Sequence, residues 1–371
     1  MTIAVNTEFL LADYYEEYRY FLKDAFNQIA KQHSEHQFIF ICRNDYKERI
    51  EFEKNVIPGV IKISGRHPLL FKWWYDIKIP AILKKYKADV FITCDGYMPL
   101  HTKISQCLFI YDLSFIHFPV VKRSQQSYLK KQIPKFLQNV NSVVTFSEYS
   151  KKDILNHYKI NSEKINVVYT AAKNIFHPLQ EDEKEMTRKK YAEGKNYFLY
   201  AGAIHPDNNL LNLLKAFSIF KKRQKSDWKL LLAGNLAAGY KDFSEKIRSY
   251  KHRGDVIWIE NIEEQEMAKL IGSSYALIYP ATSFAMPPLQ AVNYHIPVII
   301  SADDIAKEKF GEAALYVDAK DHIDIADKMM LIYKDEEMRK KLIEKGELLT
   351  KDHAWNKTID LLWQTILKAV H

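Results

Sequence analysis

Cysteine is scarce in this chain of 371 residues, and long apolar runs are missing from it. The three cysteines lie far apart in apolar contexts, which argues against a disulfide framework or a zinc site and indicates buried thiols in a reducing compartment. No stretch approaches the roughly 20 apolar residues that a membrane-spanning helix needs. Acidic residues interrupt the first apolar run, so we expect no signal peptide. These absences predict a cytoplasmic protein, with a peripheral position at the inner face of the membrane as the alternative.

Two phosphate-binding glycine motifs are also missing. Neither Gly-x-Gly-x-x-Gly nor Gly-x4-Gly-Lys-Ser/Thr occurs in the chain, which argues against a dinucleotide-dependent enzyme and against a P-loop nucleoside triphosphatase. No constellation of metal-ligating residues stands out in the sequence either. We therefore expect no metal site and no bound cofactor.

Basic residues are in excess. The chain has 54 Lys and Arg against 46 Asp and Glu, for a net charge of +8. A basic balance favours anionic partners such as nucleic acid, lipid head groups or phosphorylated substrates. The lysines are scattered through most of the chain, and this distribution equally fits a solvated surface.

Short apolar runs alternate with helix-length amphipathic segments from the first residues onward. Strands are expected over residues 3–6, 37–42 and 59–63, and helices over residues 14–32 and 69–86. Three further runs, "ADVFIT", "ISQCLFIY" and "NSVVTFS", continue the series. This alternation is typical of parallel βαβ units.

The alternation stops in a polar, charged stretch and then restarts at "NYFLYAG", with further strands expected at "WKLLLAG", "DVIWIE", "YALIYP", "PVIIS" and "ALYV". We therefore expect an N-terminal domain at residues 1–172, a linker at 173–195, a C-terminal domain at 196–353 and a final helix at 354–371. Ligands of such sheets bind beyond the carboxyl ends of the strands. The loops that follow the strands are therefore the candidate sites.

The order and spacing of these segments resemble those of glycosyltransferase family 4. In the first half the resemblance lies in "FIYDLSFIHFP", "VVTFSEYSKKDI" and "KINVVYTAAKNIFHP". In the second half it lies in "YAGAIHPDNNLLNLLKAF", "LLLAGN", "SSYALIYPATSFAMPPLQAVNYHIPVIIS" and "FGEAALYVDAKD". The resemblance covers nearly the whole chain. It implies the α/β fold called GT-B, with two Rossmann-like, doubly wound parallel-sheet domains facing a central cleft.

The resemblance also implies an activity. Members of the family transfer a sugar from a nucleotide sugar, which suggests transfer of a hexose, with retention at the anomeric carbon, to a cell-envelope or polysaccharide acceptor. The N-terminal domain would receive the acceptor and the C-terminal domain the donor, and the final helix would cross back to the N-terminal domain. The nucleotide sugar is then a substrate, and the fold usually works without a metal ion.

The family's motifs imply site residues on the loops after the strands. The residues matched to the catalytic positions are Tyr111, Asp112 and Gln290, and those on the acceptor side are Asp95, Gly96 and Ser147. The residues matched to the donor-binding positions are Gly202, Ala203, His205, Asn208, Gly234, Asn235, Asn261, Ile262, Thr282, Ser283, Phe284, Ala285, Met286 and Gln290.

Several of these positions lack the charged residue or glycine that the family usually has. The family's acids eight positions apart, Glu-Gly-Phe-Gly-Leu-Pro-x-Leu-Glu-Ala, are here Thr282 and Gln290. Its two glycines in the same motif are Ser283 and Ala285. At the position of the family's diphosphate-binding arginine this chain has Ala203. At the position of the family's lysine, a few residues later, it has Asp207 and Asn208.

These replacements affect the chemistry of sugar transfer. Negative charge builds on the departing diphosphate, and the loss of one positioned donor typically costs about 3–4 kcal/mol of barrier. One interpretation is a divergent transferase in which His205 and the helix amides near Asn208 and Pro287 hold the phosphates. Another is a catalytically inactive homologue that acts as a partner or sugar-binding subunit. A third is an unrelated nucleotide or polymer binder on the same scaffold.

Several of the candidate residues have a purely structural interpretation as well. His205 could cap the helix that follows it, and Tyr111 could fill a wall of the domain. Asp112 suits an N-cap or a turn as well as a catalytic carboxylate. Asp95-Gly96 reads as a turn after a strand, with an acceptor contact as the alternative.

One basic segment has no acidic residue, from Leu113 to Ser147. Apolar residues are interleaved there with basic ones at helical spacing, which predicts a basic amphipathic helix suited to an anionic membrane surface. The alternative is a solvated helix that packs one face on the sheet. Nucleic acid is not expected, because no recognised binding motif accompanies the charge. The basic residues are Lys122, Arg123, Lys130, Lys131 and Lys135.

Overall fold

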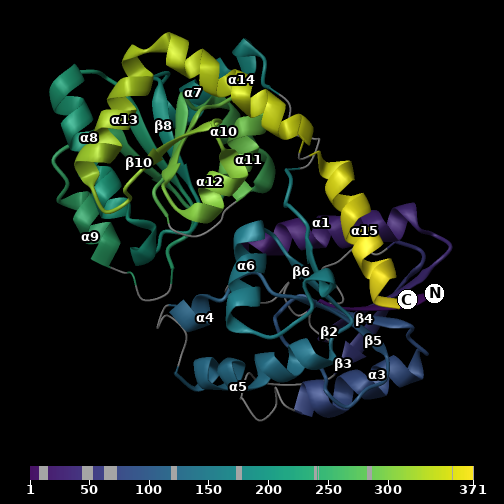
Figure 1. Cartoon of the computed structure of the whole chain (residues 1–371). Coiled ribbons are helices and arrows are strands. Elements are labelled where there is room, and N and C mark those ends of the chain that lie inside the picture. Colours follow the sequence, from purple (N-terminus) through teal and green to yellow (C-terminus); the bar gives the residue numbers. More distant parts are fainter. Residues whose placement is uncertain are drawn as a thin grey trace. The chain divides into compact units, whose positions relative to one another are not determined.

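The computed structural model divides into two compact units, and one of them is built from two separate parts of the chain (Figure 1). The N-terminal unit comprises Met1–Thr170 together with Asn356–His371, and the C-terminal unit comprises Ala171–Trp355. The structure describes residues 1–7, 16–43, 53–61, 73–117, 123–172, 178–237, 240, 242–281, 286–352 and 354–370.

A parallel sheet of seven described strands forms the centre of the N-terminal unit, in the order β3-β2-β1-β4-β5-β6-β7. Its register places Ala4 opposite Ile39 on one side and opposite Phe91 on the other. The strands form because short runs rich in β-branched and aromatic residues can be buried on both faces of a parallel sheet. They are β1 (Thr2–Asn6), β2 (Gln37–Arg43), β3 (Val56–Ile61), β4 (Val90–Thr93), β5 (Ser105–Phe109), β6 (Ser142–Thr145) and β7 (Ile165–Val167).

Helices cover both faces of this sheet. α3 (Ile79–Lys85), α5 (Arg123–Asn139) and α6 (Glu148–His157) bury apolar side chains in one core cluster with β2, β4 and β5. α1 (Glu16–Gln32) follows β1 and contacts α15 (Trp355–Val370), because the side-chain amide of Gln28 donates a hydrogen bond to the side chain of Asn356. The shorter elements are η3 (Trp74–Lys78), α4 (Ser114–His117) and η4 (Ser162–Lys164).

Contacts from α15 tie it to the N-terminal unit although it follows the C-terminal unit in the chain. The hydroxyl of Thr358 donates to the carbonyl of Tyr169 at 2.9 Å. The ring of Trp363 stacks on that of His33 with 3.9 Å between the ring centroids. The apolar face of α15, which includes Ile359, Leu362 and Ile366, is therefore buried against the unit that the chain began with.

The C-terminal unit contains a parallel sheet of six described strands in the order β10-β9-β8-β11-β12-β13. α8 and α13 pack together, and the contacts of α7, α10, α11 and α14 with one another form a second layer (Figure 1). The strands are β8 (Tyr197–Ala201), β9 (Lys229–Ala233), β10 (Val256–Ile259), β11 (Ala276–Tyr279), β12 (Val298–Ser301) and β13 (Ala314–Val317). The helices are α7 (Glu181–Ala192), η5 (Pro206–Asn208), α8 (Leu210–Gln224), α9 (Asp242–Arg248), η6 (Arg253–Asp255), α10 (Glu264–Ser273), α11 (Met286–Asn293), α12 (Asp304–Phe310), α13 (His322–Lys334) and α14 (Glu336–Asp352).

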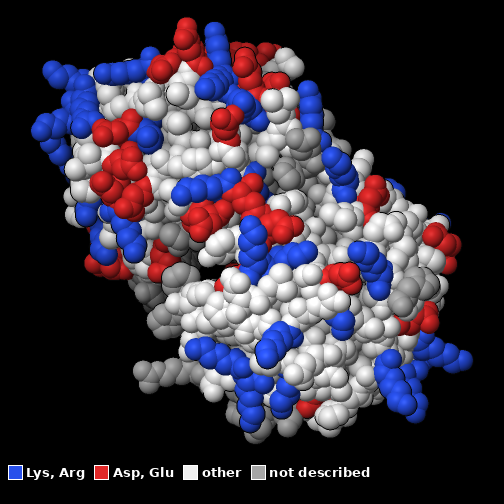
Figure 2. Space-filling model, viewed as in Figure 1, with Lys and Arg blue, Asp and Glu red and all other residues white. Residues whose placement is uncertain are grey.

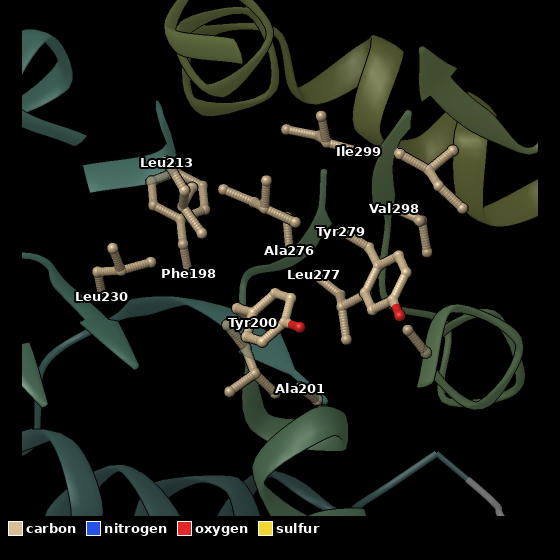
Figure 3. Close-up of a cluster of buried hydrophobic side chains, with 14 of the residues drawn as sticks. Phe198, Tyr200, Ala201, Leu213, Leu230, Ala276, Leu277, Tyr279, Val298 and Ile299 are labelled. Atoms are coloured by element: carbon tan, nitrogen blue, oxygen red, sulfur yellow. The ribbon is translucent and has the colours of Figure 1, made fainter. Parts of the chain in front are cut away.

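The core of this unit is made by the strands and the helices that cover them. Figure 3 shows side chains of β8, β9, β11 and β12 converging with Leu213 of α8. The rings of Tyr200 and Tyr279 stack with 5.7 Å between their centroids. Phe198, Leu230 and Leu277 are fully buried. Each such side chain contributes about 1.5–3 kcal/mol by its burial, so this cluster fixes the sheet that positions the loops.

The fold class that the sequence predicted is confirmed, because both units are doubly wound parallel α/β sheets. The linker predicted at 173–195 is wrong in part, since residues 181–192 form α7, which packs against α10. Charged side chains dominate α7, and only Thr187 and Ala192 are buried in it. A reciprocal capping box between Gln180 and Glu183 starts the helix. The described helices include none that combines the length and the apolar composition needed to cross a membrane.

Candidate functional site

Polar side chains gather at the carboxyl ends of β1 and β4, which are neighbours at the centre of the N-terminal sheet. Strand order reverses at this point, because β1 continues to β2 on one side whereas β4 continues to β5 on the other. Such a switch point is where open α/β sheets bind their ligands. Asn6 ends β1, Thr93 ends β4, and Asp95 follows two residues later.

The carboxylate of Asp95 is held by four donors. The hydroxyl of Tyr75 and the side-chain amide of Asn6 both donate to Oδ2, the amide over 3.0 Å. The hydroxyl of Thr93 donates to Oδ1 over 2.8 Å, and the backbone N–H of Tyr97 donates to the same oxygen over 3.3 Å. Asn6 also donates to the hydroxyl of Tyr75 at 2.7 Å. The side chain is thus fixed in one position at the switch point, and it remains partly exposed.

Burial raises the pKa of Asp95 above its ordinary value, although the hydrogen bonds from Tyr75 and Thr93 act in the opposite direction. Gly96 has φ +78°, in the left-handed region, and allows the chain to turn directly after this carboxylate. Asp95-Gly96 is therefore both a turn and the position of a partly exposed carboxylate. A carboxyl group of this kind can accept a hydrogen bond from a sugar hydroxyl or exchange a proton with it.

Two other residues predicted for this side use their polar atoms inside the protein. The hydroxyl of Tyr111 donates to the carbonyl of Cys94, and its ring stacks on Phe146 with 5.3 Å between centroids. Tyr111 therefore supports the loop that carries Asp95, in line with its structural interpretation. Ser147 caps α6 by accepting from the backbone N–H of Ser150 at 3.0 Å, and it is buried. Asp112 lies partly exposed between β5 and α4.

The carboxyl ends of β8 and β9 in the C-terminal unit pass unusually close to each other. Gly202 has φ +145° and Gly234 has φ +153°. A Cβ atom on Gly234 would lie 1.8 Å from the carbonyl oxygen of Gly202. The loops that follow these strands run side by side in parallel, and their close approach requires glycine at position 234. The carbonyl of Gly234 also accepts a hydrogen bond from Trp258 Nε1 at 2.9 Å.

Asn208, which matches a donor-binding position, uses its side-chain amide within the protein. The amide donates to the hydroxyl of Tyr200 and to the carbonyl of Ala203, both at 2.8 Å. Tyr200 itself donates to the same carbonyl at 2.8 Å. The side chain of Asn208 is only 8% exposed. Asn208 thus shapes the loop after β8 and leaves little of its amide for a ligand.

The remaining donor-side residues also link loops to one another. Nδ1 of His205 accepts from the backbone N–H of Asp207 at 3.2 Å and caps η5, as its structural interpretation predicted. The side-chain oxygen of Asn235 accepts from the backbone N–H of Asn261 at 2.7 Å, which joins the loops after β9 and β10. Ile262 packs against the core of the unit.

α11 begins at Met286, and Gln290 lies one turn further along, partly exposed. Pro287 and Pro288 occupy the first turn of α11 and have no N–H group. This helix start therefore offers fewer amides to an anion than a usual one. The expectation that amides near Pro287 favour a phosphate is weakened accordingly. Thr282, Ser283, Phe284 and Ala285, which precede α11, lie outside the described residues.

Acidic residues follow the strands at this edge. Among Asp, Glu, Lys and Arg, the first residue after β8 is Asp207, after β10 Glu260, after β12 Asp303 and after β13 Asp318. Asp303 caps α12, and burial raises its pKa above the ordinary value. The exception is the loop after β9, where the first charged residue is Lys241. A diphosphate at this edge would therefore rely on backbone N–H groups, on Lys241 or on positive charge supplied from outside these loops.

The basic segment of the N-terminal unit forms α5. Its apolar residues Ile133, Phe136 and Leu137 are buried in the core. Lys130, Lys131 and Lys135 are exposed, and Figure 2 shows basic side chains gathered where Figure 1 places α5. The apolar side of α5 is thus occupied by the sheet, and only its lysines are available to an external partner. Lys122 and the side chain of Arg123 lie outside the described residues.

Sequence reasoning missed three residues that hold Asp95. They are Asn6, Tyr75 and Thr93, and the first two are 89 and 20 residues away from it in the chain. Asn6 and Thr93 leave a trace in the sequence, as polar residues that end the apolar runs "IAVN" and "ADVFIT". A polar residue at that point of a buried parallel strand lies at the edge where ligands bind.

Two family models match this chain in succession. The model described as Glycosyltransferase Family 4 matches residues 27–172, and the model described as Glycosyl transferases group 1 matches residues 181–348. The chain is similar to the O-antigen chain mannosyltransferase RfbU of Salmonella typhimurium, with 25% identity over 291 residues that make up 75% of each protein.

Solved structures share the fold over nearly the whole chain. A glycosyltransferase from Rickettsia africae aligns with a TM-score of 0.76 and 16% identity over 100% of this chain and 98% of its own. HepE of Anabaena in complex with UDP and glucose aligns with a TM-score of 0.74 and 12% identity over 98% of both chains. These likenesses confirm the GT-B fold. With the two models matching most of its residues, the chain belongs to the group 1, or family 4, glycosyltransferases.

Proposed function

We propose that this protein transfers a hexose from a nucleotide sugar to a cell-envelope polysaccharide acceptor, with retention at the anomeric carbon. The observation that carries the proposal is the match of both units to glycosyltransferase models, together with the likeness to an O-antigen mannosyltransferase over three quarters of each chain. The nucleotide sugar is the donor substrate, and the proposal includes no cofactor or metal in the transfer itself. The reaction would take place on the cytoplasmic side of the membrane.

The C-terminal unit would hold the donor. The likeness to HepE, whose structure contains UDP and glucose, supports this assignment. The close approach of the loops at Gly202 and Gly234 places backbone groups at the edge where a nucleotide would lie. Gln290, which is neutral, would replace the usual acid as a hydrogen-bonding partner of the donor.

The N-terminal unit would receive the acceptor at its switch point. Asp95 is a fixed and partly exposed carboxylate there, and its donors hold it in place. We expect Asp95 to bind a hydroxyl group of the acceptor sugar. Asp112, which follows the neighbouring strand β5, would be a second acceptor contact.

The experiment that tests the function has two stages. Titration of the purified protein with nucleoside diphosphates and with nucleotide hexoses should reveal one nucleotide that binds in the micromolar range, about −8 kcal/mol. Incubation with that nucleotide sugar and an envelope polysaccharide fraction should then release the nucleoside diphosphate and lengthen the acceptor. Absence of nucleotide binding across the whole panel would contradict the transferase.

A second candidate function is that of a catalytically inactive partner subunit. It is favoured by the C-terminal edge, where Asn208 bonds inside the protein, Ala203 stands for an arginine and acidic residues follow four strands. In that case the protein would associate stably with an active glycosyltransferase and bind no nucleotide. Co-purification from cells, followed by the same titration panel, separates the two functions.

A peripheral membrane contact through α5 is part of the proposal. The exposed lysines would meet anionic lipid head groups, at about 1 kcal/mol for each. Reversing the charge of Lys130 and Lys131 to glutamate should reduce binding to anionic vesicles by roughly tenfold or more. The matched control reverses Lys340 and Lys341, an exposed lysine pair on α14. Equal vesicle binding by both double variants would remove the membrane contact.

A further inference from the structure

Three metal-ligating side chains meet on the N-terminal unit, outside the edge that carries Asp95. His117 ends α4, whereas Asp153 and His157 belong to α6. Residues four apart on a helix lie on the same face, one turn from each other. His117 reaches this face from the segment after β5, so the fold assembles a cluster that the sequence did not suggest.

The geometry of the cluster is compact. Nε2 of His117 lies 2.9 Å from Oδ2 of Asp153, and Nδ1 of His157 lies 3.1 Å from Oδ1 of the same carboxylate. The two imidazole rings are edge to face, with 5.2 Å between their centroids. One ligand atom from each residue can be chosen so that all three lie within 4.8 Å of one another. The carboxylate therefore bridges two imidazoles whose nitrogens converge.

These separations are close to those around a bound zinc ion. Zinc binds histidine nitrogens and carboxylate oxygens at about 2.0–2.2 Å, so neighbouring ligands of a tetrahedral site lie about 3.3–3.5 Å apart. The two nitrogen–oxygen separations in the cluster would have to widen by only a few tenths of an ångström. Nδ1 of His157 also lies 3.0 Å from the backbone carbonyl oxygen of Asp153. The hydrogen bonds of both imidazoles to Asp153 would be exchanged for nitrogen–metal bonds, after each imidazole presents a lone pair.

Exposure and ligand type narrow the choice of ion. The side chains of His117 and His157 are each 36% exposed and that of Asp153 is 13% exposed, so an ion can enter from solvent. Two imidazoles select a late transition metal over magnesium or calcium, which prefer oxygen ligands. Three protein ligands leave a fourth position of a tetrahedral site for water.

We propose that His117, Asp153 and His157 form a zinc-binding site that ties α4 to α6. The metal joins the segment after β5, which leads toward α5, to a helix packed on the sheet. The site is independent of sugar transfer, and it is expected to stabilise the N-terminal unit by mass action when zinc is present.

Zinc titration of the metal-free, full-length protein by calorimetry tests the site. The wild type should bind one zinc ion. His117→Ala and His157→Ala should each lower the zinc affinity by at least roughly 10- to 100-fold, which is the loss typical when an outer partner of a metal site is disturbed. His101→Ala is the matched control, because His101 is an exposed histidine of the same unit, and it should bind zinc as the wild type does. Magnesium in excess should not displace the zinc.

A second measurement needs no substitution and so does not depend on the folding of a variant. Zinc should protect His117 and His157 of the wild type from diethyl pyrocarbonate, with the modified residues located by mass spectrometry, while His101 reacts equally with and without the metal. Equal modification of His117 and His157 in both conditions overturns the proposal. A wild-type affinity no tighter than that of His117→Ala does so as well, and leaves the cluster as an ion pair only.

Discussion

The carboxyl edges of the two sheets are built in different ways. At the N-terminal edge, side chains from distant parts of the chain hold one carboxylate, Asp95. At the C-terminal edge, Gly234 lets two parallel loops approach closely, and asparagine amides bond to the backbone. Gly234 meets a requirement of the protein's own packing, whereas Asp95 is held in place by side chains. The comparison teaches that the loop geometry at the edge of a sheet and the charge placed there can be set independently.

The largest effect on stability is expected where the loops after β8 and β9 approach each other. Gly234→Ala would place a methyl group 1.8 Å from the carbonyl oxygen of Gly202, in a backbone conformation that L residues rarely adopt. We expect a loss of more than about 4 kcal/mol from the free energy of unfolding of the C-terminal unit. Urea denaturation followed by tryptophan fluorescence and circular dichroism measures it.

Gly254→Ala is the control for this change. Gly254 lies in the same unit, and an added Cβ there would meet nothing within 4 Å. It should change the free energy of unfolding by less than about 0.5 kcal/mol. If both variants unfolded at the same urea concentration, the tight contact between the two loops at Gly234 would not be important for stability.

The N-terminal edge is expected to respond next. Asp95→Asn replaces an acceptor of four hydrogen bonds by a side chain with one acceptor oxygen. The donors on one side, either Asn6 and Tyr75 or Thr93 and Tyr97, then face an NH2 group. The expected loss is about 1–3 kcal/mol in the N-terminal unit. The substitution should also lower the rate of sugar transfer if the acceptor binds there.

The same variant has a distinctive pH dependence. Because the pKa of Asp95 in the folded protein is raised above its ordinary 3.8, the folded state keeps a proton that the unfolded chain has lost. The contribution of Asp95 is full below 3.8 and declines as the pH rises through the folded pKa. Wild type should therefore lose stability over this window relative to Asp95→Asn. Asp360→Asn, at an exposed position of α15, serves as the control, and equal slopes in all three proteins would contradict the raised pKa.

A smaller effect is expected at Asn208. Asn208→Ala removes two hydrogen bonds, but Tyr200 still donates to the carbonyl of Ala203, so a loss of about 1 kcal/mol is expected. Asn208→Asp sets a carboxylate against that carbonyl and should cost more. Nucleotide affinity should change by less than about threefold in Asn208→Ala, below 0.7 kcal/mol. A tenfold drop in affinity with unchanged stability would instead place the amide on the ligand.

The smallest effect is expected in the reactivity of the cysteines, which reports on the N-terminal unit alone. All three cysteines lie in the N-terminal unit and are buried. Burial raises the pKa of Cys107 to about 12 and that of Cys94 above its usual range, so native thiols should not react with iodoacetamide at neutral pH. Gly234→Ala should leave this protection almost unchanged, whereas Asp95→Asn should speed the reaction. Rapid labelling of the native wild type would contradict the buried state.

Much of the fold could be predicted because burial on both faces of a parallel sheet leaves short apolar runs in the sequence. "QFIFIC" covers β2 except for Arg43, "NYFLYAG" contains β8, and the final helix could be placed by its family resemblance. α7 could not be predicted, since its stability rests on capping and on contacts with α10 rather than on a wide apolar face. For α5 the sequence left two alternatives, a membrane-facing helix and one packed on the sheet, and its apolar residues are buried in the core.

The candidate site was less accessible to sequence reasoning. The loops could be located because strand ends are where such sheets bind ligands. The partners of Asp95 could not be found, because Asn6 and Tyr75 approach it only in the folded sheet. Asn208 could be matched to a donor-binding position, but the hydrogen bond from its side-chain amide to the carbonyl of Ala203 could not be found in the sequence.

The return of α15 to the first unit has a consequence for biosynthesis. The N-terminal sheet leaves the ribosome first, yet the helix whose Trp363 stacks on His33 is translated only after the entire C-terminal unit. Until then the surface beside α1 lacks its apolar cover and is exposed to solvent. Completion of the first unit thus waits for the second, which makes the order of folding partly the reverse of the order of synthesis.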